Sequence, residues 1–187
     1  INKGVTEEDL LRTAEVVFRS GWQRIKVYFM LGLPTETDED ILEIARLVNT
    51  LLEIGRRVRG KMVEVSVTVS TFVPKPHTPF QWVPLEQRST VGHRQELLRR
   101  SLPKRGVKLS WSDWDATWLE ALISRGDRRL GQVILRAWQM GARFDAWQES
   151  FNPGLWRQAL HDQALDGDWF TTRQRQRDEL LPWDHID

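Results

Sequence analysis

Two alternating segments separated by one long helical pattern constrain the fold of this chain more than any other feature. Both segments repeat every two residues, which is the period of a strand. The first places Ile25, Val27, Phe29, Leu31 and Leu33 on one face and Lys26, Tyr28, Met30 and Gly32 on the other. The second sets Val63, Val65, Val67 and Val69 against Glu64, Ser66, Thr68 and Ser70. The order strand, helix, strand favours an α/β fold with a parallel sheet, open or barrel-shaped.

The helix between these strands begins after Thr37 and ends near Gly60, and another helix precedes them, from Thr6 to about Gly21. Four prolines predict an irregular loop over residues 73–84. Beyond it, the pattern predicts helices over 85–102, 114–124, 127–140 and 152–163 and a short strand over 107–111. We therefore predict three parts: residues 1–84, a connection over 85–111, and a Trp-rich helical extension over 112–187. Five of its indoles are expected to be mostly buried: Trp114, Trp118, Trp138, Trp147 and Trp156.

Composition excludes several classes of protein. Hydrophobic residues make up 40% and charged residues 28%, which is typical of a globular chain with a core. The net charge of +1 gives no overall electrostatic case for nucleic acid or membrane. The absence of Cys excludes disulfides and thiolate metal sites within these residues, and the four His have no metal-ligand spacing. No apolar run reaches about 18 residues, so we expect no membrane partner and a cytoplasmic location.

Three features could carry a function. The polar face of the two strands indicates either a barrel lumen that binds a ligand or a solvent-facing strand, and the pattern leaves both open. Gly32 to Glu36 lies where a strand meets a helix, a usual place for ligands, although a turn with a helix cap explains it better. Two basic clusters, 56–61 and 104–108, could contact phosphate, but cations are also favoured at helix ends.

Several runs resemble radical S-adenosylmethionine proteins. Residues 25–40, IKVYFMLGLPTETDED, resemble a late strand and helix start of their barrel, and residues 70–82, STFVPKPHTPFQW, resemble the strand and proline loop that follow. Three further runs resemble the C-terminal extension of a cobalamin-binding-type subgroup: Ser124–Leu130, Gly141–Trp147 and Leu181–Asp187. The resemblance covers nearly the whole chain.

The resemblance implies the C-terminal portion of a partial (β/α) TIM-type barrel, followed by a mainly α-helical extension. It also implies S-adenosylmethionine and a [4Fe–4S] cluster as cofactors of a longer protein, with cobalamin possible through an upstream domain. The family holds its cluster with a Cys-x3-Cys-x2-Cys run, which nothing here matches. The start of the chain at Ile1 resembles a position more than halfway through such a barrel. We therefore expect a C-terminal piece of a radical enzyme that is inactive alone and binds neither cofactor alone.

Carried over residue by residue, the resemblance gives no catalytic residue and no metal ligand, but it implies a wall around S-adenosylmethionine. The residues of this wall are Tyr28, Met30, Gly32, Leu33, Glu36, Ser66, Thr68, Ser70, Val73 and Pro74. The alternative function is a non-catalytic RNA- or protein-binding module. Because a half-barrel has an unpaired strand edge, we also expect the chain to self-associate.

Overall fold

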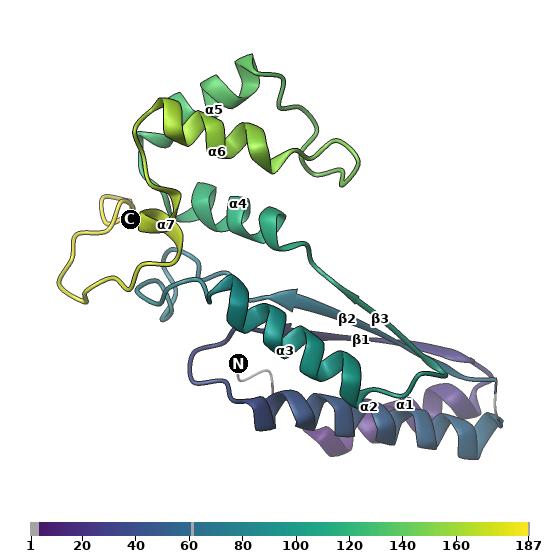
Figure 1. Cartoon of the computed structure of the whole chain (residues 1–187). Coiled ribbons are helices and arrows are strands. Elements are labelled where there is room, and N and C mark those ends of the chain that lie inside the picture. The colour runs from purple at the N-terminus through teal and green to yellow at the C-terminus, as the bar shows by residue number, and fades with distance from the viewer. Residues whose placement is uncertain (1–3, 61, 187) are drawn as a thin grey trace. The chain divides into compact units, whose positions relative to one another are not determined.

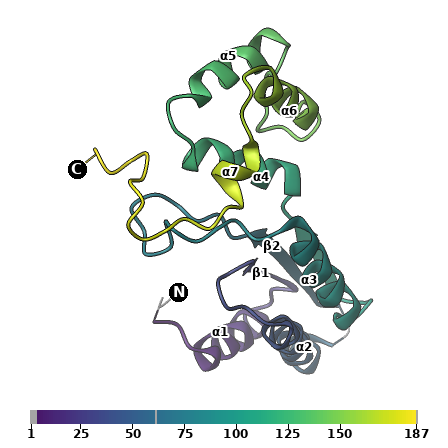
Figure 2. The same ribbon diagram turned by 60° about the vertical axis from the view of Figure 1, so that its left-hand side comes forward.

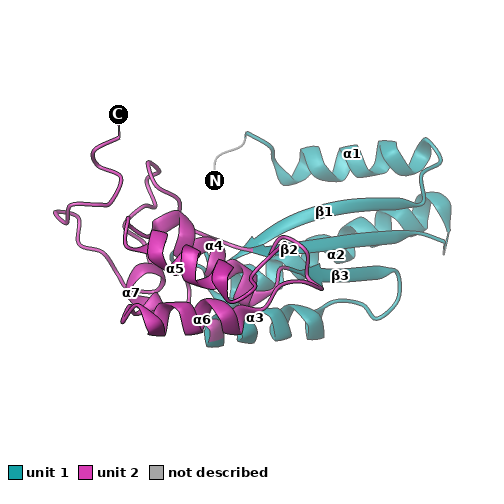
Figure 3. Ribbon diagram, turned by 90° about the horizontal axis from the view of Figure 1, so that it is seen from above, with its two compact units in different colours: residues 1–70, 89–111 teal, residues 71–88, 112–187 magenta. Residues whose placement is uncertain are grey.

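A computed structural model describes residues 4–60 and 62–186 of the chain. These residues form two compact units that interleave along the sequence (Figure 3). The first unit runs to residue 70 and includes 89–111, and the second consists of 71–88 and 112–187. The proline loop therefore groups with the C-terminal helices, whereas the connection over 89–111 groups with the two alternating strands. This division differs from the sequential boundaries predicted from the sequence.

The first unit is an α/β arrangement with a three-stranded parallel sheet in the order β1–β2–β3 (Figure 1). Its elements follow as α1 (Glu7–Arg19), β1 (Arg24–Leu31), α2 (Asp38–Arg59), β2 (Glu64–Thr71), α3 (Arg88–Ser101) and β3 (Val107–Trp111). In the register of β2 and β3, Ser66 lies opposite Lys108 and Thr68 opposite Ser110. The predicted neighbouring strands joined by a helix are thus confirmed.

Local sequence explains where the two long helices of this unit begin. Thr6 accepts a hydrogen bond from the Asp9 amide, and the Asp9 carboxylate accepts one from the Thr6 amide. Thr37 and Asp40 form the same reciprocal capping box at the start of α2. Each box satisfies two amides that a helix start leaves without partners, and the acidic first turn is favoured by the helix dipole.

The core of the first unit lies between the aliphatic face of the sheet and the helices. Val65, Val67 and Val69 of β2 are fully buried together with Phe18 of α1 and Leu98 of α3. The buried stripe of α2 contributes Ile41, Val48, Leu51 and Leu52 to the same cluster. Figures 1 and 2 show α1, α2 and α3 gathered on one side of the strands. This arrangement removes the aliphatic face from water and leaves the opposite face without helices of this unit.

The prediction of a TIM-type barrel portion is wrong. The described residues form one open sheet of three strands with edges at β1 and β3, so the coarse α/β class holds and the barrel does not. A barrel needs a sheet that closes on itself with consistent strand number and stagger. Alternation along a strand fixes which side chains share a face, and it carries no information on closure.

The second unit is mainly helical, with α4 (Trp114–Arg125), α5 (Leu130–Gln139), α6 (Pro153–Asp162) and the short α7 (Gly167–Thr171). Its core holds Trp118, Leu122, Val133, Trp156 and Phe170. The loop before α3 joins this unit through a hydrogen bond from the Leu85 amide to the Thr171 carbonyl, 2.9 Å long. None of the helices in the described ranges of the chain is long and apolar enough to cross a membrane.

Two of the indoles predicted to be buried are exposed. Trp118 and Trp156 lie in the core, but Trp138 is 54% and Trp147 59% exposed. Helix α5 buries Leu130, Val133 and Ala137, which share one face, and Trp138 follows about 100° further round the helix. The prediction failed for these two indoles because it relied on residue type and did not take into account which face of the helix is buried.

Candidate functional site

The exposed face of the sheet carries half of the side chains predicted to form a ligand wall. We call it the polar sheet face, and it consists of Lys26, Tyr28, Met30, Glu64, Ser66, Thr68, Ser70, Lys108 and Ser110. The last two come from β3, which places them opposite Ser66 and Thr68. Sequence reasoning missed these two because β3 is too short for a convincing alternation.

Tyr28 is the most prominent side chain of the polar sheet face. It is 70% exposed, and the Lys26 ammonium lies 5.0 Å from the centre of its ring. The hydroxyls beside it already form hydrogen bonds within the sheet. The Thr68 and Ser110 hydroxyls are 3.2 Å apart, and Ser70 donates to the Phe29 carbonyl at 3.4 Å. The face thus combines an aromatic ring with a row of hydroxyls that can exchange these partners for a ligand.

The loop after β1 is held in place by a buried ion pair. Gly32 has a φ of +84°, which favours glycine, and its amide donates to the Glu36 carboxylate at 2.8 Å. Arg94 of α3 lies 2.9 Å from the same carboxylate oxygen and also donates to the Glu36 carbonyl at 2.5 Å. The Glu36 side chain is 6% exposed and that of Arg94 9%. Through these contacts Glu36 fixes the loop at the end of β1.

Of the remaining predicted residues, Leu33 lies at this strand end, whereas Val73 and Pro74 do not. Leu33 follows Gly32 and is half-buried. Val73 and Pro74 belong to the second unit, where both are buried. The Pro74 carbonyl accepts a hydrogen bond from Nη1 of Arg125 at 3.1 Å. Val73 and Pro74 therefore serve the core of the helical unit and expose little surface to a ligand.

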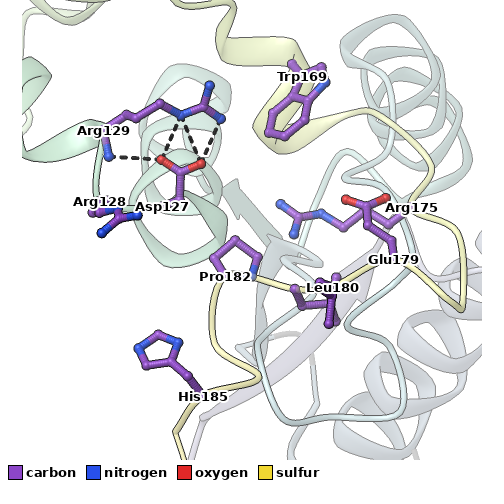
Figure 4. Close-up of a pocket in the computed structure, with 10 residues that line it drawn as sticks. Asp127, Arg128, Arg129, Trp169, Arg175, Glu179, Leu180, Pro182 and His185 are labelled. Atoms are coloured by element: carbon purple, nitrogen blue, oxygen red, sulfur yellow. Dashed lines mark hydrogen bonds and ion pairs between the residues drawn. The ribbon is translucent and has the colours of Figure 1, made fainter.

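A separate pocket of about 680 Å³ lies within the second unit (Figure 4). Three segments line it: the turn before α5, the end of α7, and the chain that follows α7. The lining residues are Asp127, Arg128, Arg129, Trp169, Arg175, Glu179, Leu180, Leu181, Pro182 and His185. The runs 124–130 and 181–187, which both contribute to the family resemblance, thus meet at one site.

The carboxylates of this pocket are already paired. Arg129 donates to both oxygens of Asp127, with its Nη2 2.7 Å from Oδ2, as the dashed lines in Figure 4 show. Arg173 binds both oxygens of Glu179, at 2.8 and 2.6 Å. These hydrogen bonds lower the pKa of Asp127 and the pKa of Glu179 from their ordinary values.

Two guanidinium groups are buried in this unit, and one of them, that of Arg175, lines the pocket. Arg175, 2% exposed, donates from Nη2 to the carbonyls of Arg125 and Phe170 and lies over the Trp183 ring. Arg125, fully buried, donates to the carbonyls of Pro74 and Phe170. Burial, together with the nearby charges of Arg175 and Arg173, lowers the pKa of Arg125 to about 10. Neither forms an ion pair with a carboxylate of the described residues.

The two basic clusters, 56–61 and 104–108, meet in the first unit at the connections from α2 to β2 and from α3 to β3. Nη2 of Arg56 donates to the Arg105 carbonyl at 3.0 Å. Arg57, Arg59 and Lys104 beside them are exposed. Lys61 lies outside the described residues. The two clusters are separate in the sequence but form one positively charged surface in the structure.

Comparisons with known proteins give one relative. An uncharacterised protein of Methanocaldococcus jannaschii is 28% identical to the chain over 134 residues. The match includes 72% of this chain but spans only 28% of that protein's length. No family model matches the chain, and no solved structure matches it. The predicted barrel portion thus has no support from known folds either.

Proposed function

We propose that this chain belongs to a radical S-adenosylmethionine protein and that its polar sheet face forms part of the wall around S-adenosylmethionine. One observation carries the proposal: the aliphatic face of the sheet is covered by helices, while the polar face is open and holds Tyr28 beside a row of hydroxyls. A polar face on a parallel sheet is unusual, because such sheets are normally buried on both faces. The choice of S-adenosylmethionine as the ligand comes from the resemblance of residues 25–40 and 70–82 to that family.

The polar sheet face offers groups that suit an adenosyl ligand. The exposed Tyr28 ring can stack on adenine, and base–aromatic stacking contributes roughly 1–3 kcal/mol. The hydroxyls of Ser66, Thr68 and Ser70 can donate to or accept from ribose and carboxylate groups. The loop fixed by Glu36 and Arg94 presents the backbone of Gly32 and Leu33 at the strand end. In this proposal Val73 and Pro74 are left out of the wall because they are buried.

The iron–sulfur cluster does not fit this chain. The cluster is held by cysteine thiolates, and the 187 residues contain no Cys. Among the residues that the structure describes, no group of three or more His, Asp or Glu side chains could hold a metal ion. A cluster that acts with this chain therefore needs thiolates from elsewhere, and we assign neither cluster ligands nor cobalamin ligands here.

The experiment uses the natural protein in which this chain occurs, reconstituted anaerobically with iron and sulfide and then reduced. The proposal predicts formation of 5′-deoxyadenosine from S-adenosylmethionine. Tyr28→Ala should raise the KM for S-adenosylmethionine at least about fivefold, the equivalent of about 1 kcal/mol of stacking. Trp22→Ala is the matched control, because Trp22 is an exposed aromatic residue outside the polar sheet face. A reconstituted cluster without 5′-deoxyadenosine, or equal effects of both variants, would refute the proposal.

The joined basic clusters favour RNA binding as a second candidate function. Arg56 and Arg105 are in contact at the end of the first unit, with Arg57, Arg59 and Lys104 exposed around them. If about four phosphates are contacted, log K should fall with log[salt] with a slope near −3 for single strands. The double variant Arg56→Gln, Arg105→Gln should flatten that slope. Affinity that does not change with salt would exclude this candidate.

A further inference from the structure

The pocket of the second unit has an excess of positive charge that its own carboxylates do not balance. Asp127 is bound by Arg129, and Glu179 is bound by Arg173. Two lining arginines, Arg128 and Arg175, form no ion pair within the described residues. Arg128 is exposed at the rim, whereas Arg175 is buried at the inner wall. The lining therefore offers two uncompensated cations at different depths.

Arg175 is the group that points most strongly to a ligand. The hydrogen bonds of its side chain to described residues all come from Nη2, Nη1 donates to none of them, and Nε is buried without an acceptor. Figure 4 shows the guanidinium directed from the chain after α7 toward the space between Asp127 and Trp169. A buried charge is costly unless it is paired and hydrogen-bonded. Nε is too deeply buried for a ligand in the pocket to reach, so an anion would bind through Nη1 and compensate the charge of the guanidinium group.

A second buried cation, Arg125, increases the need for a compensating negative charge near Arg175. Arg125 is fully buried, its Nη2 also lacks an acceptor, and its carbonyl accepts from Nη2 of Arg175. Glu179 is near enough to raise the pKa of Arg175, but its carboxylate oxygens bind Arg173, and burial lowers the pKa of Arg175 overall. The groups around Arg175 thus leave a positive field at the inner wall of the pocket.

We propose that this pocket binds the phosphate group of a small molecule, with Arg175 at its base and Arg128 at its rim. A phosphate monoester carries a charge of about −1.5 to −2 at pH 7, which matches two unpaired guanidinium groups better than a carboxylate does. The volume of about 680 Å³ is in the range of small-molecule sites. Trp169, which lines the pocket and is partly exposed, provides an apolar wall for the rest of the ligand.

This proposal does not rest on the proposed function, because it concerns other residues and needs neither S-adenosylmethionine nor a cluster. The test is calorimetric titration of the chain with inorganic phosphate and with phenyl phosphate, at constant ionic strength. We expect saturable binding of both, with phenyl phosphate the tighter ligand. Trp169→Ala should remove that preference and leave inorganic phosphate unaffected. If only inorganic phosphate binds wild-type chain, the ligand is a free ion and the small-molecule proposal fails.

A matched pair of variants distinguishes phosphate binding in the pocket from non-specific attraction of anions to the positively charged surface. Arg128→Gln removes a lining cation, and Arg177→Gln removes an exposed cation of the nearby chain that does not line the pocket. Neither side chain has a hydrogen bond or ion pair within the described residues, so both variants should fold. Arg128→Gln should weaken phosphate binding about tenfold, and Arg177→Gln should have little effect. No saturable heat at about 10 mM phosphate, or equal weakening by both variants, would overturn the proposal.

Discussion

Arg94 and Glu36 lie 58 positions apart in the sequence, yet their side chains form a buried ion pair of 2.9 Å that fixes the loop after β1. The same carboxylate oxygen of Glu36 accepts the amide of Gly32, so one side chain joins the strand end to α3. Removal of either side chain would break this buried ion pair.

This pair predicts an asymmetric response to mutation. Arg94→Met should lower the free energy of unfolding by about 3–5 kcal/mol, because the Glu36 carboxylate loses its cation. Adding Glu36→Gln to that variant should recover part of the loss. Arg99→Gln is the control, since the Arg99–Glu96 pair is on the surface of the same helix, where solvent screening leaves it a much smaller contribution to stability. Urea denaturation of the four proteins measures these values. Equal losses for Arg94 and Arg99 would contradict a buried role.

The two faces of β1 should respond differently to truncation. Leu31 is fully buried, so Leu31→Ala should cost about 2–5 kcal/mol through lost burial and a residual cavity. Tyr28→Ala removes a ring from the exposed polar sheet face and should change stability by less than about 0.5 kcal/mol. Thermal denaturation followed by circular dichroism compares the two. A large loss for Tyr28→Ala would mean that the polar sheet face is covered.

Acid should weaken the second unit through Asp127 and Glu179. Their hydrogen bonds to Arg129 and Arg173 lower the pKa of each carboxylate in the folded chain, so the unfolded chain binds protons first as pH falls. This stability is therefore present above the ordinary values of 3.8 and 4.5 and is lost as pH falls through the folded values. Arg173→Gln should reduce the difference in unfolding free energy between pH 6 and pH 2.5 by up to about 1 kcal/mol. An unchanged difference would exclude the pair as a contributor.

The open sheet also predicts self-association. The strands β1 and β3 are edges in the described part of the chain, and unpaired edges recruit other chains. Lys26 and Lys108 on these edges oppose such pairing, so it should strengthen with salt. Sedimentation velocity over a range of concentrations and salt provides the measurement. A single monomer boundary under every condition would exclude this prediction.

Much of the first unit could be predicted from local pattern. Alternation gave both long strands, and the Thr-x-x-Asp runs at Thr6 and Thr37 gave two helix starts, because each depends on residues close in sequence. The barrel prediction failed because strand number and closure depend on distant pairing. The partner of Glu36 was not predictable for the same reason, as nothing near Glu36 specifies Arg94.

Only part of the pocket of the second unit could be predicted from the sequence. The runs 124–130 and 181–187 were recognised separately, but their meeting depends on a C-terminal segment without periodicity. Arg175 had no signal at all, because a buried arginine and an exposed one look alike in a sequence. Its role depends on how residues 172–186 run in three dimensions, which the sequence does not show.

The central proposal, that the polar sheet face contacts S-adenosylmethionine, is tested most directly by ultraviolet cross-linking. The natural protein in which this chain occurs is irradiated with radiolabelled S-adenosylmethionine, and the labelled peptides are identified by mass spectrometry. The proposal predicts label within residues 25–36 or 64–71, lost with excess unlabelled ligand and reduced by Tyr28→Ala but not by Trp22→Ala. Label that is competed by unlabelled ligand yet confined to peptides outside these two segments would contradict it.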